Sequence, residues 1–198
     1  RRLTMAIRLE KGQRINLEKS NGSKLTEFCV GCNWGAIVSG GFLGFGKSVH
    51  DVDLDLSCVM LDADGKLVDY ALHHSGDDRK GDQAGDDGLD NEIITVDLNR
   101  VSPNVDRIFF FLNNCGKEDF SQIPYASIRM YEGTPQRVKE VFASYDVAAE
   151  PRFRDMTALV MGKLYRRNGE WRFSAIGDAY PDPNLCETIK RIVTNYAK

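Results

Sequence analysis

Histidine and cysteine are scarce in this sequence, which contains three of the first and five of the second among 198 residues. An odd number of scattered cysteines does not make a disulfide framework, so we expect reduced thiols and a cytoplasmic location. No apolar run approaches the length of a membrane span, and the basic N-terminus lacks the apolar core and cleavage site of a signal peptide. The sequence is therefore unlike that of a small secreted protein stabilised by disulfides.

A strong net charge is also absent, because the formal net charge is −3 and the pI is about 5.7. A nucleic-acid-binding domain usually carries a basic excess, so we expect no nucleic-acid partner. Hydrophobic residues make up 42% and charged residues 28% of the chain, as in ordinary soluble globular proteins. Since no low-complexity linker divides the chain, we expect one domain over residues 1–198, with residues 1–4 as an extension before Met5.

Short segments that alternate between polar and apolar residues dominate the chain and predict β-strands. The predicted strands are residues 6–9, 14–17, 25–34, 52–61, 67–72, 93–98, 107–112, 126–131, 137–146, 157–165 and 171–176. Residues 35–47 are glycine-rich and are expected to form a loop. Only residues 185–193 repeat apolar side chains at helical spacing. The prediction is an all-β protein, an antiparallel β-sandwich of about ten strands with a C-terminal α-helix.

The stretch from residue 73 to residue 92 is strongly acidic and has no apolar period. Its carboxylates are Asp77, Asp78, Asp82, Asp86, Asp87, Asp90 and Glu92. Only two cations, Arg79 and Lys80, lie among them, and four glycines let the backbone turn its carbonyls inward. This pattern fits either a solvated acidic loop or a site for Ca²⁺, which takes six to eight oxygen ligands.

A second acidic segment favours the metal site. Asp51, Asp53 and Asp55 alternate with apolar residues, so all three carboxylates are expected on one side of an extended segment, with Leu54 and Leu56 facing the core. Three neighbouring carboxylates repel one another unless a cation lies among them. An edge strand decorated with charge is the alternative, although such strands more often use lysine. The two acidic segments together predict calcium binding.

Two other motifs suggest different functions. Residues 41–48, Gly-Phe-Leu-Gly-Phe-Gly-Lys-Ser, match the phosphate-loop pattern and would make Lys47 part of a nucleotide-binding enzyme. However, a strand pattern with three aspartates follows them where a helix is required. Cys29 and Cys32 have the spacing of a zinc or redox pair, but no second pair is present and no βαβ unit surrounds them. We keep both motifs as alternatives.

Several ordered motifs resemble those of the TerD family of tellurium-resistance proteins. They are the opening MAIRLEKGQRINL from Met5, VGCNW at 30–34, DLDLS at 53–57, HSGDD at 74–78, ASIR at 126–129 and LYRRNGEWRF at 164–173. Asp78 stands where the family usually has Asn, and Lys80 where it usually has Thr. The loop over residues 81–92 is longer than that of the family.

The resemblance implies a calcium-binding β-sandwich with a cytoplasmic role in stress and tellurite resistance and no catalytic activity. It also implies that the protein acts as an interaction or scaffolding module, with other tellurium-resistance proteins or a membrane-associated complex as partners. The location would then be the cytoplasm or the inner face of the membrane. By position, the implied metal ligands are Asp53, Asp55, Asp77, Asp78, Asp90 and Glu92. The carbonyl of Gly81 and the carboxylates of Asp82, Asp86 and Asp87 are further candidates.

Overall fold

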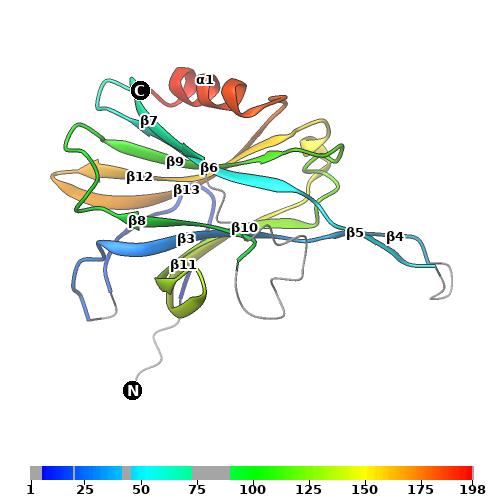
Figure 1. The fold of residues 1–198 in the computed structure, drawn as a ribbon, viewed down its shortest axis with the longest axis horizontal. Coiled ribbons are helices and arrows are strands. Elements are labelled where there is room, and N and C mark those ends of the chain that lie inside the picture. Colours follow the sequence, from blue (N-terminus) through cyan, green and yellow to red (C-terminus); the bar gives the residue numbers. More distant parts are fainter. Residues whose placement is uncertain (1–5, 20, 42–45, 73–89, 198) are drawn as a thin grey trace.

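Two β-sheets pack face to face and one helix covers the outer side of the larger sheet in the computed structural model, which describes residues 6–19, 21–41, 46–72 and 90–197 (Figure 1). The five-stranded sheet has the order β1 (Ile7–Leu9), β11 (Arg137–Ala148), β10 (Tyr125–Thr134), β3 (Glu27–Trp34), β8 (Glu92–Asp97). The six-stranded sheet has the order β2 (Arg14–Asn16), β13 (Glu170–Tyr180), β12 (Ala158–Arg167), β9 (Arg107–Asn114), β6 (Leu54–Leu61), β7 (Leu67–Leu72). The predicted sandwich is confirmed.

The centre of the six-stranded sheet is apolar on both faces. Along β9, Ile108 and Phe110 belong to the core between the two sheets. Phe109 and Phe111 point the other way and are covered by α1 (Leu185–Asn195) (Figure 1). The continuous apolar run in this part of the sequence therefore reflects a strand that is buried from both sides rather than a half-exposed strand.

Helix α1 begins where the sequence predicts it. Asn184 is its N-cap, and the side-chain oxygen accepts a hydrogen bond from the backbone N–H of Glu187. The side chain of Ile192 is fully buried against the sheet. Arg191 pairs with the buried carboxylate of Asp182, with Nη2 and Oδ1 2.6 Å apart. Within the described residues, no helix has both the length and the apolar character needed to cross a bilayer.

Two features of the topology differ from the predictions. The pairing between β1 and β11 is parallel, so the sandwich is not purely antiparallel. Residues 35–47, predicted as a loop, contain β4 (Ile37–Ser39), which pairs with β5 (Ser48–His50). These two strands form a ribbon that projects from the sandwich (Figure 1), and Val38 and Val49 are 59% and 61% exposed. Local sequence patterns do not predict this ribbon, because the segment is rich in glycine and each of the two strands has only three residues.

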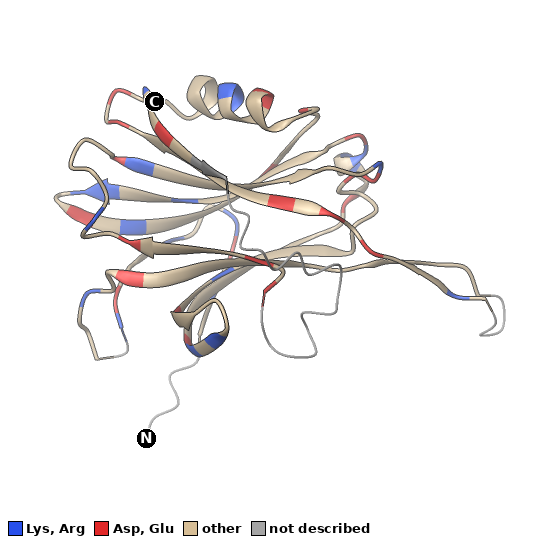
Figure 2. Ribbon diagram, in the orientation of Figure 1, with Lys and Arg blue, Asp and Glu red and all other residues tan. Residues whose placement is uncertain are grey.

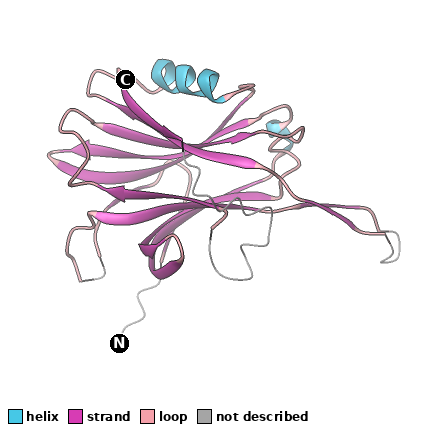
Figure 3. Cartoon of the chain, viewed as in Figure 1, coloured by secondary structure: helices cyan, strands magenta, loops and turns pink. Residues whose placement is uncertain are grey.

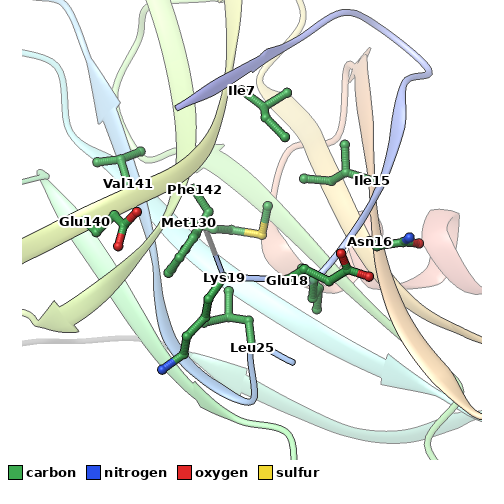
Figure 4. Close-up of a pocket in the computed structure, with 11 residues that line it drawn as sticks. Ile7, Ile15, Asn16, Glu18, Lys19, Leu25, Met130, Glu140, Val141 and Phe142 are labelled. Carbon is green, nitrogen blue, oxygen red and sulfur yellow. The ribbon is translucent and has the colours of Figure 1, made fainter. Parts of the chain in front are cut away.

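The connection between β1 and β2 is short, yet the two strands belong to different sheets. A hollow of about 320 Å³ lies beside them at this open side of the sandwich. Figure 4 shows Met130 in this hollow, with Ile7 and Ile15 from the two strands near it. The hollow is mainly apolar, and it lies outside the acidic segments that the sequence singles out.

Candidate functional site

The aspartates before and within β6 lie as the alternation predicts. Val52, Leu54 and Leu56 are buried, whereas Asp53 is exposed and Asp55 is half-buried. No lysine or arginine of the described residues forms an ion pair with either carboxylate. Figure 2 shows acidic residues in succession at the end of β6 that leads to the ribbon. Within the described ranges, then, no lysine or arginine compensates the negative charge of these two aspartates.

Cys115, at the end of β9, shows how negative this region is. Its thiol donates a hydrogen bond to Oδ2 of Asp55, with the two atoms 2.9 Å apart. Burial raises the pKa of the Cys115 thiol to about 12, together with the hydrogen bond to Asp55 and the charges of Asp55, Asp53 and Glu92. The carboxylates of both acidic segments are thus close enough to act on one thiol.

Glu92 brings the second acidic segment to this place. It is the first residue of β8, in the five-stranded sheet, and its side chain is buried. Its Oε2 accepts a hydrogen bond from the backbone N–H of Leu56 in the six-stranded sheet, at 2.5 Å. The carboxylate therefore reaches from one sheet to the other and lies beside the strand that carries Asp55.

Asp90 lies elsewhere and has a cationic partner. Its Oδ2 lies 2.8 Å from Nε of Arg129, whose neighbours Ile128 and Met130 face the core. The Asp90–Arg129 pair is therefore on the outer face of the five-stranded sheet. Burial raises the pKa of Asp90, although the charge of Arg129 and its hydrogen bond oppose this rise. A carboxylate already paired in this way is a poor ligand for a second cation.

The remaining predicted ligands lie outside the described residues: Asp77, Asp78, Gly81, Asp82, Asp86 and Asp87. In the part of the chain that is described, no group of three or more His, Cys, Asp or Glu side chains is close enough to hold a metal ion. The described part thus brings together Asp53, Asp55 and Glu92 as one region, separates Asp90 from it, and does not by itself complete a coordination shell.

Two residues that border this region are not predicted by the sequence patterns. Glu118, in the connection after β9, pairs with Nε2 of His50 at the base of the ribbon. Burial alone would raise the pKa of the Glu118 carboxyl, but hydrogen bonds and the charge of His50 hold it below its usual value. Their place near the acidic segment follows from the pairing of Leu54 with Asn114, which brings the end of β9 beside Asp53. That pairing is not visible in local sequence patterns.

The phosphate-loop motif lacks the structure that its chemistry requires. Lys47 and Ser48 are followed by strand β5 instead of by a helix, and within the described residues no helix N-terminus adjoins them. This context gives no support to a nucleotide site. Residues 42–45 of the motif lie outside the described residues.

Cys29 and Cys32 both lie on β3 but belong to different apolar clusters, on opposite faces of the sheet. They therefore cannot bind one zinc ion together. Burial raises the pKa of both thiols, which disfavours the thiolate form needed for metal binding or redox chemistry.

Comparisons with known proteins identify the class of this sandwich. The TerD domain family matches residues 5–196. Stress response protein SCP2 of Bacillus subtilis is 34% identical over 96% of this chain and all of its own length. Tellurium resistance protein TerD of Serratia marcescens is 31% identical, over 89% of this chain and 92% of its own length.

A solved structure shares the fold. The crystal structure of a homologue of telluride resistance protein (TerD) from Streptomyces coelicolor A3(2) superimposes with a TM-score of 0.54 at 16% identity. The alignment covers 88% of this chain and 98% of that one. The chain belongs to the TerD family of tellurium-resistance and stress proteins.

Proposed function

We propose that this protein binds Ca²⁺ at the end of the sandwich that carries Asp53, Asp55 and Glu92. The observation that carries the proposal is that two acidic segments, far apart in the sequence, act on one thiol: Cys115 donates a hydrogen bond to Asp55, and the charges of Asp53 and Glu92 raise its pKa. A folded protein gains nothing from placing like charges together unless a cation neutralises them.

The donor chemistry fits this ion. Asp53, Asp55 and Glu92 offer hard carboxylate oxygens, which Ca²⁺ prefers, and no histidine or thiolate is needed. Three carboxylates do not fill six to eight positions, so backbone carbonyls, water and the acidic stretch over residues 77–87 would supply the rest. The participation of that stretch remains a prediction.

The test is thermal unfolding with calcium and with a chelator. Ligand at a hundred times its dissociation constant stabilises a protein by about 2.7 kcal/mol, which corresponds to a rise in Tm of roughly 5–10 °C for a domain of this size. Asp53→Asn and Asp55→Asn should lose most of this rise. Calorimetric titration with Ca²⁺ and with Mg²⁺ would give the stoichiometry and the selectivity.

Asp64→Asn is the matched control, because it removes the same charge from the turn at the other end of β6. It should keep the full calcium-dependent rise in Tm. The proposal is wrong if Asp55→Asn retains the same rise as wild type, or if Asp64→Asn loses as much of it as Asp55→Asn does.

We further infer that the protein acts without catalysis, as a calcium-ordered module that binds a partner in the cytoplasm or at the inner face of the membrane. The names of its relatives describe resistance and stress response rather than a reaction. Growth of a tellurite-sensitive host that expresses the protein tests the role. Wild type and Asp64→Asn should restore growth, whereas Asp55→Asn should not. Equal growth with Asp55→Asn and wild type would contradict a calcium-dependent role.

A further inference from the structure

A group of basic residues surrounds a small buried side chain on the outer face of the six-stranded sheet. Strand register places Arg14, Ser174 and Lys163 directly side by side on β2, β13 and β12. Neighbouring strands are about 4.8 Å apart, so the two cations flank the serine on either side. Ser174 is 6% exposed. Ser174 is therefore a short, buried side chain between two long basic ones.

A third cation adjoins the same serine. Arg172 lies two residues before Ser174 on β13 and so points to the same face. Its Nε donates a hydrogen bond to Oδ1 of Asn16, 2.7 Å away, which orients the guanidinium group and leaves its other N–H groups for a ligand. We call Arg14, Lys163, Arg172 and Ser174 the Ser174 site.

These cations lack acidic partners. Among the described residues, no carboxylate forms an ion pair with Arg14, Lys163 or Arg172. The nearby Arg107, in contrast, lies 3.3 Å from the carboxylate of Asp106. Three cations without an ion-pair partner in the described part of the chain thus lie on one face of the six-stranded sheet, in a protein of net charge −3. Figure 2 shows basic residues on β12 and β13 at the end of the sheet away from the acidic residues at the start of β6.

Contacts with aromatic rings explain part of the environment of Lys163. Its Nζ lies 5.7 Å from the ring centre of Phe109 and 5.4 Å from that of Tyr165, so cation–π contacts stabilise it. Burial and the positive charges of Arg107 and Arg14 nevertheless lower the pKa of Lys163, although the negative charge of Asp106 opposes this fall. The hydroxyl oxygen of Tyr165 is also buried without a hydrogen-bond partner. Aromatic packing accounts for neither Arg14 nor Arg172.

We propose that the Ser174 site binds a phosphate group of a ligand. One tetrahedral oxyanion can lie between three cations and accept a hydrogen bond from the serine hydroxyl, and guanidinium groups suit phosphate oxygens in particular. All four residues of the Ser174 site are charged or polar, so they would recognise the phosphate group itself and not an organic portion of the ligand. The source is either a soluble phosphate ester or the headgroup of an anionic lipid.

Binding is measured with calcium-free protein by following backbone amide chemical shifts during titration with glycerol 3-phosphate. The amides of Ser174, Lys163 and Arg14 should shift together and saturate. Lys163→Met keeps the aliphatic contact with the two rings but removes the charge. Because a hydrogen bond to a charged group contributes about 1.5 kcal/mol or more, this variant should weaken binding about tenfold. Arg172→Gln should have a similar effect.

Lys139→Met and Arg8→Gln are matched controls, because they remove exposed cations from the five-stranded sheet. They should leave binding unchanged. The proposal is overturned if no amide near Ser174 shifts with either phosphate source, or if Lys139→Met weakens binding as much as Lys163→Met does. Melting curves confirm that each variant is folded.

The source is decided with vesicles of phosphatidylcholine with and without phosphatidic acid. Sedimentation only with the acidic vesicles, reduced by Lys163→Met but not by Lys139→Met, supports a lipid headgroup. Saturable binding of glycerol 3-phosphate without vesicle binding supports a soluble ester. Either pattern supports the Ser174 site. The outcome is independent of calcium binding, since the acidic residues belong to another part of the fold.

Discussion

Asp90 and Glu92 are two positions apart in the chain, yet their carboxylates act on opposite sides of the five-stranded sheet. Asp90 pairs with Arg129 on the outer face, whereas Glu92 reaches the backbone of Leu56 in the other sheet. Both residues are about 4% exposed. Both residues are predicted metal ligands, but their environments differ. The carboxylate of Asp90 is already paired with Arg129, whereas that of Glu92 lies in the same region as Asp53 and Asp55.

Loss of Arg129 should destabilise the fold. Arg129→Met leaves the Asp90 carboxylate buried without its cation, which usually costs about 3 kcal/mol or more in the free energy of unfolding. Denaturant unfolding at neutral pH measures the loss. The double variant Asp90→Asn with Arg129→Met removes the buried charge and should recover more than half of it. Equal stability of the single and double variants would show that the ion pair is not the cause.

A methyl group at Gly31 should disturb the same pair. A Cβ atom built there would lie 1.9 Å from Oδ2 of Asp90, far closer than any real contact. We expect Gly31→Ala to lower the free energy of unfolding by about 2 kcal/mol, as overpacking does. In an Asp90→Gly background none of the three Asp90 atoms that crowd the methyl group remains, so the added loss should fall below about 1 kcal/mol. Strict additivity of the two changes would contradict this explanation.

Asp119 should give a pH-dependent contribution to stability. Burial alone would raise its pKa, but hydrogen bonds from Ser121, from Gln122 and from the backbone N–H of Asp155 outweigh burial and lower it. The folded pKa is therefore below the unfolded value of about 3.9. Its contribution is complete above that pH and is lost as the pH falls through the folded pKa.

Asp119→Asn should accordingly cost about 1 kcal/mol at neutral pH, and the difference from wild type should shrink as the pH falls below about 4. Urea unfolding over a pH series measures this. Asp64→Asn, at an exposed turn, should show no such trend. A difference that stays constant from neutral to acid pH would mean that the charge of Asp119 is not involved.

The packing of helix α1 against the sheet should depend mainly on one side chain, that of Ile192. Ile192 is fully buried against Phe109 and Val160, whereas Ile189 is only partly buried at the same interface. Ile192→Ala should cost about 3 kcal/mol and Ile189→Ala about 1 kcal/mol. Thermal and denaturant unfolding compare the two. Similar losses for both variants would indicate that the helix is held by its ion pair and N-cap instead.

Local sequence patterns predict much of this fold, because polar and apolar residues alternate along a strand that has one solvent-exposed face. Leu54 and Leu56 face the core between the two acidic positions Asp53 and Asp55, and the alternation alone predicts both the strand and the side on which the carboxylates lie. The helix is visible for the same reason, since one face meets the sheet and the other meets water. Asn168 and Gly169, which join β12 to β13, both have the positive φ values that a two-residue β-hairpin turn requires.

Local sequence patterns do not predict the features that depend on contacts between residues distant in the sequence. The separation of Asp90 from Glu92 depends on Gly31 and Arg129, which come from two other strands. The place of Cys115 beside Asp55 depends on the pairing of β9 with β6. The basic residues of the Ser174 site are scattered over three strands, and only the register brings them together.

The placement of β1 and β2 in different sheets has a consequence for folding during synthesis. β1 pairs with residues 143–145 of β11, and β2 pairs with residues 172–174 of β13. One of these contacts, from Arg172 to Asn16, joins positions 156 residues apart. Strands β1 and β2 therefore remain without these partners until β11 and β13 have been synthesised. Such long-range pairing slows folding, and strand edges that wait for their partners are open to aggregation.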